Sequence, residues 1–577
     1  MSAILGVDVG GTFTDAVLLA DGELRTAKVP TAERQEASVL AAARAVGAVD
    51  VERFTHGTTV ATNALLERRG ARTALVTTRG FEHVLHLARQ TRPHLYRLCE
   101  PPPEPLVPLD RCHGVRERIG PEGILEPLDL ASLPDVSAEA IAVCTLFSFR
   151  APEHELRLAA ELRRRYPDAH VVASHEVAPE FREYERCSTT VADAYLTPGL
   201  ARYLRSLGEL CGDELPQPLV MLSSGGVVPL ELAASHAAWA VLSGPAGGVV
   251  GASLVALRAG FDDALAFDMG GTSTDVCAIV GGSVQRSAER TIGGLPIRLP
   301  SVDVHTVGAG GGSIVWRDPG GALRVGPQSA GASPGPACYG RGGEHATVTD
   351  ANLVLGRLPD RLPGGLELDV AAAERALDGV DPDAVVQVVN AEMLNALRVV
   401  SVERGLDPRG FALVAYGGAG ALHACALADE LELRTVLVPE AAGVLSALGL
   451  VAADERRDEV RSRVVPLADA GALPQDAELD LRYRGQSHEL TVAAEDDVAE
   501  AFHRAHEERY GFADRGRELE LVAVRRSHVR RGPQIELRGE RRATRGPALV
   551  ELPGSTCWVP DGWAGETDVH GTLVLTR

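Results

Sequence analysis

The sequence predicts an α/β fold of two similar lobes around a central cleft, followed by a smaller, mainly β C-terminal domain. The main observation is a repeat: residues 8–15 read Asp-Val-Gly-Gly-Thr-Phe-Thr-Asp, and residues 268–275 read Asp-Met-Gly-Gly-Thr-Ser-Thr-Asp. Each copy follows an apolar strand and precedes another apolar run, so each is expected at the tip of a β-hairpin. Alternating strands and helices around the second copy indicate an α/β lobe.

The change of pattern along the chain predicts three domains. The first lobe starts with the first hairpin and continues through strands such as Thr73–Thr77. After about residue 455, short alternating runs such as Glu478–Tyr483 indicate strands, and the tail is basic and punctuated by Pro and Gly. The expected domains are residues 1–195, 196–455 and 456–577.

The bulk composition excludes several classes of protein. The chain has 577 residues, 45% of them hydrophobic, which is enough for several domains with real cores. Its formal net charge of -22 repels phosphate backbones, so we expect no nucleic-acid partner. The nine cysteines form no C-x-x-C pair, and no basic leader precedes the first strand at Ile4. Both observations favour reduced thiols in a cytoplasmic protein.

One uncharged segment, residues 237–257, is long enough to span a bilayer. It contains Ser243-Gly244-Pro245 and further glycines, which break a continuous span. We therefore expect a short strand, a tight turn and a buried helix here, and no membrane association.

The repeated motif is suited to phosphate binding. Two adjacent glycines let the backbone turn sharply, and consecutive N–H groups can then cradle phosphate oxygens. The leading Asp8 and Asp268 can hold Mg²⁺ (or Mn²⁺) through water, or accept a proton. No Walker A sequence occurs. The residues expected to bind phosphate are Gly10, Gly11, Thr12, Thr14, Asp15, Gly270, Gly271, Thr272, Thr274 and Asp275.

Paired hairpins of this kind resemble the superfamily of acetate and sugar kinases, heat-shock chaperones and actin. The resemblance implies two RNase H-like (actin-like ATPase) lobes with ATP in the cleft between them. Residues 242–248 and 443–449 are similar to the two interdomain connectors of that superfamily. Residues 416–424 are similar to its adenosine loop, which assigns adenosine contacts to Gly417, Gly418, Ala419 and Gly420.

A closer resemblance is to the hydantoinase A / 5-oxoprolinase family, from about residue 4 to residue 455. It rests on residues 55–64, 89–96, 182–186, 302–313, 326–340 and 348–352. The chain departs from the family in a compressed stretch near residues 455–478. It also has Ser223-Ser224-Gly225-Gly226 where the family more often has Ser-Asn-Gly-Gly, which would alter one polar contact near the cleft.

The family resemblance implies an ATP-dependent enzyme that phosphorylates a carbonyl oxygen. The expected substrate is a cyclic amide or imide (a hydantoin, 5-oxoproline or a lactam), and the expected partner is a B-type hydantoinase subunit in a hetero-oligomer. The family also implies an alternative, a subunit of an ATP-dependent ketone carboxylase, and no residue separates the two. A nucleotide-switched, actin-like binding protein and a sugar kinase are the remaining alternatives.

The segment from Asp303 to Ser313 also suggests a site. Asp303 and His305 lie two apart on an expected strand, so both side chains would point to one face. An Asp–His pair can orient a base or bind a metal, and the glycines that follow permit close approach of a ligand. The alternative is a structural hydrogen bond at the end of a strand.

Basic side chains of the first lobe are candidates for substrate or phosphate contact, because guanidinium groups bind oxyanions in a bidentate manner. The alternative is ion pairing with Glu183 and Glu185, or a structural role for the histidine. The candidates are His56, Arg89, Arg92, Arg182 and Arg186.

The assignment of Asp268 leads to a first prediction. Asp268→Ala should lower ATP turnover at least ~100-fold, the scale expected for loss of a general base or metal site. A steady-state ATPase assay measures this. Near-normal turnover would remove Asp268 from the mechanism.

Overall fold

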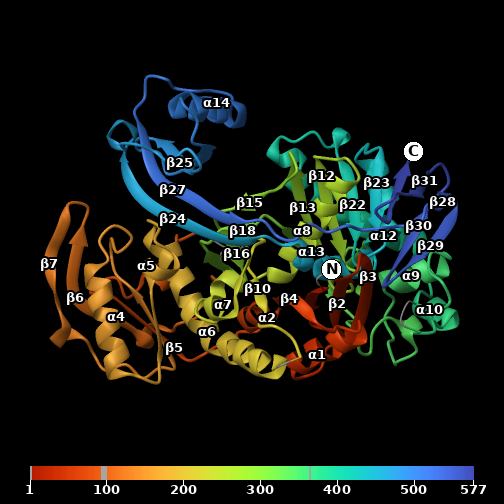
Figure 1. The fold of residues 1–577 in the computed structure, drawn as a ribbon, viewed down its shortest axis with the longest axis horizontal. Coiled ribbons are helices and arrows are strands. Elements are labelled where there is room, and N and C mark those ends of the chain that lie inside the picture. The colour runs from red at the N-terminus through yellow and green to blue at the C-terminus, as the bar shows by residue number, and fades with distance from the viewer. Residues whose placement is uncertain (1–2, 92–95, 97–100, 213, 363–364) are drawn as a thin grey trace.

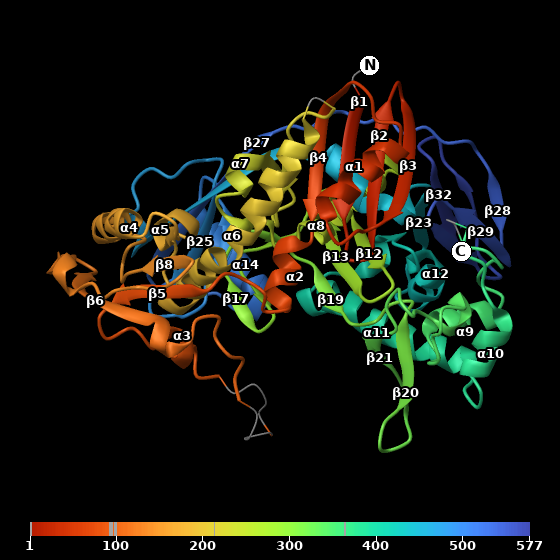
Figure 2. The ribbon, with the colours of Figure 1, turned by 90° about the horizontal axis from the view of Figure 1, so that it is seen from below.

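The computed structural model describes residues 3–91, 96, 101–212, 214–362 and 365–577. Within these residues the strands form two large mixed sheets, a five-stranded sheet and several two-stranded ribbons. The five-stranded sheet lies at one end of the molecule, and the C-terminal strands lie at the other (Figure 1 and Figure 2). The fold is therefore α/β, as the sequence predicts.

The first large sheet contains the first motif hairpin. Its strands, in spatial order, are β26 (Leu490–Ala493), β25 (Glu478–Tyr483), β27 (Leu519–Arg530), β24 (Glu455–Pro466), β11 (Val227–Pro229), β10 (Leu219–Met221), β4 (Val51–Thr58), β1 (Ala3–Val9), β2 (Phe13–Ala20) and β3 (Glu23–Pro30). Strands β24 and β27 are long and carry this sheet towards the five-stranded sheet (Figure 1).

The second large sheet contains the second motif hairpin. Its order is β14 (Ser283–Val284), β13 (Thr274–Val280), β12 (Ala264–Met269), β22 (Ala412–Tyr416), β23 (Thr435–Pro439), β32 (Thr572–Thr576), β31 (Ala564–Thr567) and β28 (Ala543–Arg545). A further strand, β19 (His305–Val307), pairs antiparallel with β13.

The two large sheets share one arrangement around their hairpins. In each, three antiparallel strands are followed by two parallel strands, in the order β3-β2-β1-β4-β10 and β14-β13-β12-β22-β23. The internal repeat of the sequence is therefore a repeat of a whole five-stranded unit. The hairpin tip and the start of the following loop occupy corresponding places in both copies.

The remaining sheet and the helices complete the first half of the chain. The five-stranded sheet runs β7 (Gly123–Asp129), β6 (Cys112–Gly120), β5 (Thr73–Thr78), β8 (Ala140–Cys144) and β9 (His170–Ala173). Its neighbours include α4 (Glu153–Arg165), α5 (Ser174–Val177) and the long α6 (Glu183–Cys211). The other helices here are α1 (Gln35–Ala45), α2 (Val60–Leu66), α3 (Val84–Leu87) and α7 (Leu230–Ala233).

Two helices hold the large sheets together. The uncharged segment forms a short 3₁₀ turn, Ala237–Ala240, and then α8 (Ser243–Arg258), which packs on α13 (Leu445–Ala452). A Cβ on Gly449 would overlap the backbone of Gly247, so only glycine permits this approach. Ile4 of the first sheet shares a buried cluster with Leu448 of α13 and with Phe267 of the second sheet. The two hairpins are thus attached to one continuous core.

Among the other helices of the second half, α11 (Pro382–Val400) and α12 (Gly420–Glu430) pack on the second sheet, and α9 (Val348–Val354) packs between α11 and α10 (Val370–Ala376). Helix α14 (Val498–Tyr510) packs on β26 of the first large sheet. The helical stretch 382–404, which includes α11, is long and apolar enough to cross a membrane by length and composition. Its α11 part, however, packs on β13, β19 and β21 (Leu323–Ser329), as a core helix does.

The sheets do not follow the predicted domain limits. Strands β10 and β11, expected in the second lobe, belong to the sheet of the first hairpin. Residues 456–577 add strands to both large sheets in addition to their own ribbon, β29 (Ala548–Leu552) with β30 (Ser555–Val559). The alternating pattern of these residues correctly indicated strands, but it carries no information about which sheet each strand joins.

Candidate functional site

The two motif copies form hairpins with the same register. Asp8 lies opposite Asp15 in the first hairpin, and Asp268 lies opposite Asp275 in the second. Each tip is closed by one backbone hydrogen bond, from Gly10 N to Phe13 O (2.9 Å) and from Gly270 N to Ser273 O (3.0 Å). The predicted hairpins are confirmed.

The residues at the two hairpin tips are exposed to solvent. Gly11 and Gly271 are exposed, and a Cβ on either would meet no atom within 4 Å. Thr12 and Thr272 are also exposed. These four residues can receive phosphate oxygens, as the sequence predicts.

Thr14 and Thr274 were expected to add donors to phosphate, and here the structure differs. Both are buried. The Thr14 hydroxyl lies 3.0 Å from the Thr31 hydroxyl, and the Thr274 hydroxyl donates to Ala309 O at 2.6 Å. The reason is the alternation of a strand: adjacent side chains point to opposite faces, so Thr14 and Thr274, which directly follow Phe13 and Ser273, return to the buried face.

The hairpin carboxylates interact across the cleft. Burial, and then the negative charge of Asp275, raise the pKa of Asp268 to about 8, with smaller contributions from Asp8 and Asp15 of the other hairpin. Burial, and then the charge of Asp15, raise the pKa of Asp8 to about 7. Four carboxylates therefore share one poorly solvated space, which favours a bound cation.

Lys28 on β3 is the cation that the sequence analysis missed. Its ammonium donates to Asp15 Oδ1 at 2.6 Å, and its charge lowers the pKa values of both Asp8 and Asp268. A signal was present in the sequence, because Lys28 is the only lysine in the chain, and every other basic side chain apart from histidine is arginine. Since an ammonium is a compact point charge, it suits phosphate neutralisation between two hairpins.

The surroundings of Asp8 and Asp268 fit a hydrated divalent cation. Asp8 Oδ1 is buried and has no hydrogen-bond donor among the described residues. A Cβ on Gly57 would overlap the Asp8 carboxylate, and one on Gly417 would overlap that of Asp268. No group of three His, Cys, Asp or Glu side chains in the described part of the chain is arranged to hold a metal. A Mg²⁺ ion here would therefore take its other ligands from water and phosphate.

The predicted adenosine loop lies beside the second hairpin. It follows β22, whose Tyr416 is paired with Asp268, and it leads into α12 at Gly420. Ala419 N donates to Met269 O at 2.9 Å, and Ser555 Oγ donates to Gly417 O at 2.9 Å. The loop thus lies beside the second hairpin, and its role in binding adenosine stays a prediction.

The glycine-rich segment after His305 supports the second hairpin tip. Gly311 N donates to Gly270 O at 3.0 Å, and Gly312 N donates to Gly271 O at 2.7 Å. A Cβ on Gly310 would lie 2.7 Å from the backbone of Gly271. The expected close approach is real, but the group that approaches is the hairpin backbone and not a ligand.

The Asp–His pair of this segment is separated by its contacts. Asp303 lies between β18 (Ser301–Val302) and β19, and its carboxylate forms an ion pair with Arg404. His305 is paired with Val276 on β13, where its charge lowers the pKa of Asp275. Asp303 and His305 do not lie on one continuous strand, because β18 ends at Val302 and β19 begins at His305. A joint catalytic role of the two residues stays a prediction.

His56 is satisfied by the protein itself. It is buried, with Nδ1 3.1 Å from Val7 O and Nε2 2.9 Å from the Tyr203 hydroxyl. Burial lowers its pKa to about 4, so the ring is neutral at pH 7. No ring nitrogen remains for a substrate, which favours the structural alternative.

The arginine candidates are largely engaged in internal contacts. Arg89 makes a bidentate pair with Glu185, and Arg182 donates to Glu489 and to Ser487 O. Arg186 is fully buried and donates to two backbone carbonyls, those of Glu180 and Thr145. Arg92 lies outside the described residues. The expected ion pair with Glu185 is thus confirmed for Arg89, whereas Arg182 pairs with Glu489 and not with Glu183 or Glu185. A structural role fits Arg186.

The comparisons with known proteins identify the family. A model described as "Hydantoinase/oxoprolinase N-terminal region" matches residues 4–166, and one described as "Hydantoinase/oxoprolinase" matches residues 186–459. The chain therefore belongs to the hydantoinase/oxoprolinase family, as its motifs predict.

Among curated relatives, the caprolactamase subunit alpha of Pseudomonas jessenii is 33% identical over 99% of both chains. The 5-oxoprolinase 1 of Arabidopsis thaliana is 35% identical over 81% of this chain, which spans only 44% of that longer protein. The acetophenone carboxylase gamma subunit of Aromatoleum aromaticum is 35% identical over 77% of this chain and 67% of its own length. Hydrolases of cyclic amides and a carboxylase thus share this chain's family.

Solved structures confirm the mixed α/β fold with large sheets. The ATP-dependent caprolactamase of Pseudomonas jessenii superposes with a TM-score of 0.87 at 32% identity, over 99% of both chains. A nucleotide-free acetone carboxylase gives a TM-score of 0.76 at 24% identity, again over 99% of both, which shows the fold alone.

The raised pKa of Asp268 predicts how stability depends on pH. In the folded state the Asp268 carboxyl has a pKa of about 8, whereas the ordinary pKa of an aspartate is 3.8. Between these two pH values the folded state therefore binds one proton that the unfolded state has lost. The stability that this group contributes therefore falls as the pH rises through that window. Asp268→Asn should raise the unfolding midpoint at pH 8 by about 1–3 °C and change it little at pH 4. Thermal unfolding of the ligand-free protein measures this.

The surface variant Asp407→Asn is the control. The Asp407 side chain bonds to Arg409, which lowers its pKa, so its removal should give no gain at pH 8. An Asp268→Asn protein that is less stable than the parent at pH 8 would contradict the electrostatic account of the cleft.

The single lysine allows a direct test of the phosphate site. An amine-reactive ester should modify only Lys28 and the N-terminal amine, because no other primary amine exists in the chain. ATP should protect Lys28, and Lys28→Met should weaken ATP binding at least ~10-fold, the scale of a lost charge-assisted contact. Peptide mass spectrometry and calorimetry are the measurements. Equal labelling with and without ATP would place the phosphates elsewhere.

Proposed function

We propose that this chain is the ATP-using subunit of an enzyme that opens a cyclic amide or imide. The observation that carries the proposal is the pair of hairpins, with identical register and electrostatic contact between them. In this reading the two five-stranded units are RNase H-like lobes, and the nucleotide lies between their hairpins. The shared order of the strands in both units supports it.

The proposed binding of ATP uses four parts of the chain. The tips Gly10–Gly11 and Gly270–Gly271 donate backbone N–H groups to the phosphates. Lys28 neutralises phosphate charge, and the loop 417–420 holds the adenosine. Asp8 and Asp268 would hold Mg²⁺, which neutralises the charge that develops on the phosphates when it is bound. The desolvated setting strengthens each of these contacts.

The proposed reaction activates a carbonyl. The terminal phosphoryl group of ATP moves to the amide oxygen and ADP leaves, which makes the carbonyl carbon more electrophilic and its oxygen a better leaving group. One water then adds to this carbon, and the C–N bond breaks, with a proton going to the nitrogen, to give an acyl phosphate. A second water hydrolyses the acyl phosphate and releases inorganic phosphate. Overall, ATP, the cyclic amide and two waters yield ADP, inorganic phosphate and a ring-opened amino acid. Positioning and charge neutralisation are the protein's contribution.

The similarity to a caprolactamase subunit and to 5-oxoprolinases supports an amide substrate. The similarity to an acetophenone carboxylase subunit supports a second candidate, the activation of a ketone for carboxylation. Two of the relatives are subunits, of a caprolactamase and of an acetophenone carboxylase, which supports a hetero-oligomer. We propose a B-type hydantoinase subunit as the partner.

The test is an ATPase assay of the full chain with and without a co-expressed B-type subunit. Hydantoins, 5-oxoproline and lactams are one set of candidate substrates, and ketones with bicarbonate are the other. We expect ADP release coupled one-to-one to ring opening when both subunits are present. Bicarbonate-dependent ADP release with a ketone, and none with any cyclic amide, would replace the amide by the ketone. ATP turnover with neither class would overturn both candidates.

A further inference from the structure

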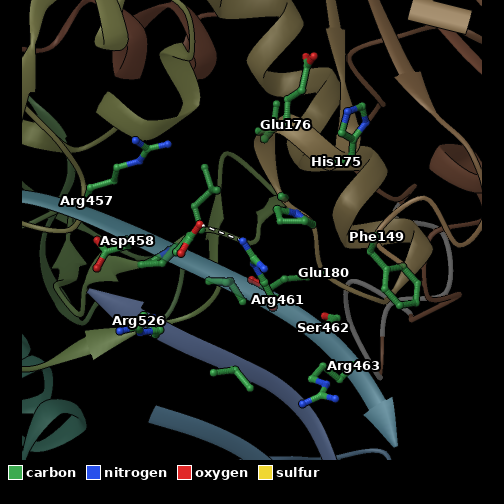
Figure 3. A pocket seen from close by; sticks show the side chains of 18 of the residues that line it. Phe149, His175, Glu176, Glu180, Arg457, Asp458, Arg461, Ser462, Arg463 and Arg526 are labelled. Carbon is green, nitrogen blue, oxygen red and sulfur yellow. Dashed lines mark hydrogen bonds and ion pairs between the residues drawn. The ribbon is translucent and has the colours of Figure 1, made fainter. Parts of the chain in front are cut away.

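One cavity lined by described residues lies away from the hairpins. Its volume is about 960 Å³, and it lies between the long strands β24 and β27, helix α5 and the segment that follows α5 up to Glu180 (Figure 3). The wall also includes the turn between β10 and β11. This volume is at the upper end of the range for small-molecule sites.

The wall carries more positive than negative side chains, although the chain as a whole is strongly acidic. Glu180 is fully engaged by Arg298 and Arg525, and Glu176 by Arg163. Among the described residues, Arg150 and Arg457, both exposed to solvent, have no ion pair or side-chain hydrogen bond. The lining arginines are Arg150, Arg456, Arg457, Arg461, Arg463 and Arg526, against Glu176, Glu180, Asp458 and Glu459. Uncompensated positive charge here favours an anion.

A buried hydroxyl without a partner faces the same space. Ser224 lines the cavity with 3% of its surface exposed, and its Oγ makes no hydrogen bond within the described residues. The neighbouring Ser223 is different, because its hydroxyl bonds to the carbonyls of Trp239 and Val241. A buried polar atom without a partner costs free energy unless a ligand or water satisfies it.

Ser224 is held in place by the turn around it. Gly225 N donates to Leu222 O at 3.0 Å, and Ser224 O accepts from Arg286 Nε at 2.9 Å. Apolar side chains line the cavity on the same turn and beyond it, including Leu222, Trp239 and Leu299. The wall thus offers a fixed hydroxyl, a free guanidinium and an apolar surface.

We propose that this cavity binds an organic carboxylate with an apolar body, at a site separate from the nucleotide hairpins. Arg457 supplies the cation, the Ser224 hydroxyl supplies a hydrogen bond, and the apolar wall holds the body of the ligand. A monovalent anion fits better than a nucleotide or a polyphosphate, since only two of the lining arginines lack a protein partner. The proposal stands independently of the ATP-dependent reaction.

The test measures the affinity of the full chain for hexanoate, the probe, by isothermal titration calorimetry. Hexanamide is the neutral counterpart, and inorganic phosphate is the bare anion. We expect hexanoate to bind at least ~10-fold more tightly than either, because only hexanoate satisfies both the charge and the apolar surface. Hexanoate binding no stronger than that of hexanamide, or than that of phosphate, would overturn the proposal.

Two variants locate the binding. Arg457→Gln should weaken hexanoate at least ~10-fold, and Ser224→Ala should weaken it ~3- to 10-fold, the scales of a charge-assisted and a neutral hydrogen bond. Arg409→Gln is the matched control, an exposed arginine outside the cavity. Both cavity variants should bind ATP like the parent chain, which separates this site from the hairpins. Unchanged hexanoate affinity in Arg457→Gln would overturn the assignment.

Discussion

The burial of four carboxylates in the two hairpins, and secondarily the repulsion felt by Asp8 and Asp268, is the constraint on which the site depends. Asp8, Asp15, Asp268 and Asp275 come from two hairpins more than 250 residues apart in sequence. Of these, Asp8 and Asp268 have their pKa values raised towards neutrality. Such an arrangement is unfavourable for the ligand-free fold, and a structure retains it where a cation or a charged ligand offsets the repulsion. Lys28 offsets it only in part, which leaves the cleft suited to a metal-bound phosphate.

The packing of the connectors makes this arrangement possible. Helices α8 and α13 approach through glycine, and they join the two large sheets into one core. Gly244, in the first turn of α8, lies against Asp8, and a Cβ there would be 3.6 Å from both carboxylate oxygens. Helix α8, which helps to hold the two large sheets together, therefore also lies beside the Asp8 carboxylate. Because this interface is closely packed, a movement of α8 against α13 would also displace the residues that contact Asp8.

The sequence predicted what local pattern determines and missed what depends on long-range pairing. The two hairpins, the strand before the adenosine loop and the buried helix after residue 243 follow from periodicity and glycine placement. The partners of β10, β24 and β32 do not, because strand order is set by tertiary packing. The same limit applies to the charged residues predicted to contact the substrate or to act in catalysis. Arg89 and Asp303 each form an ion pair with a residue distant in sequence, Glu185 and Arg404 respectively, and local pattern does not reveal such partners. Lys28 was overlooked because it lies on the strand beside the motif and not within it.

The central claim is that both hairpins contact the phosphates of one nucleotide. A structure of the chain with a non-hydrolysable ATP analogue and Mg²⁺ tests it most directly. The account predicts phosphate oxygens within hydrogen-bond distance of backbone N–H groups in both tips, with Lys28 beside them and adenine at the loop 417–420. A nucleotide bound at one hairpin only, or in the cavity beside Arg457, would contradict the account.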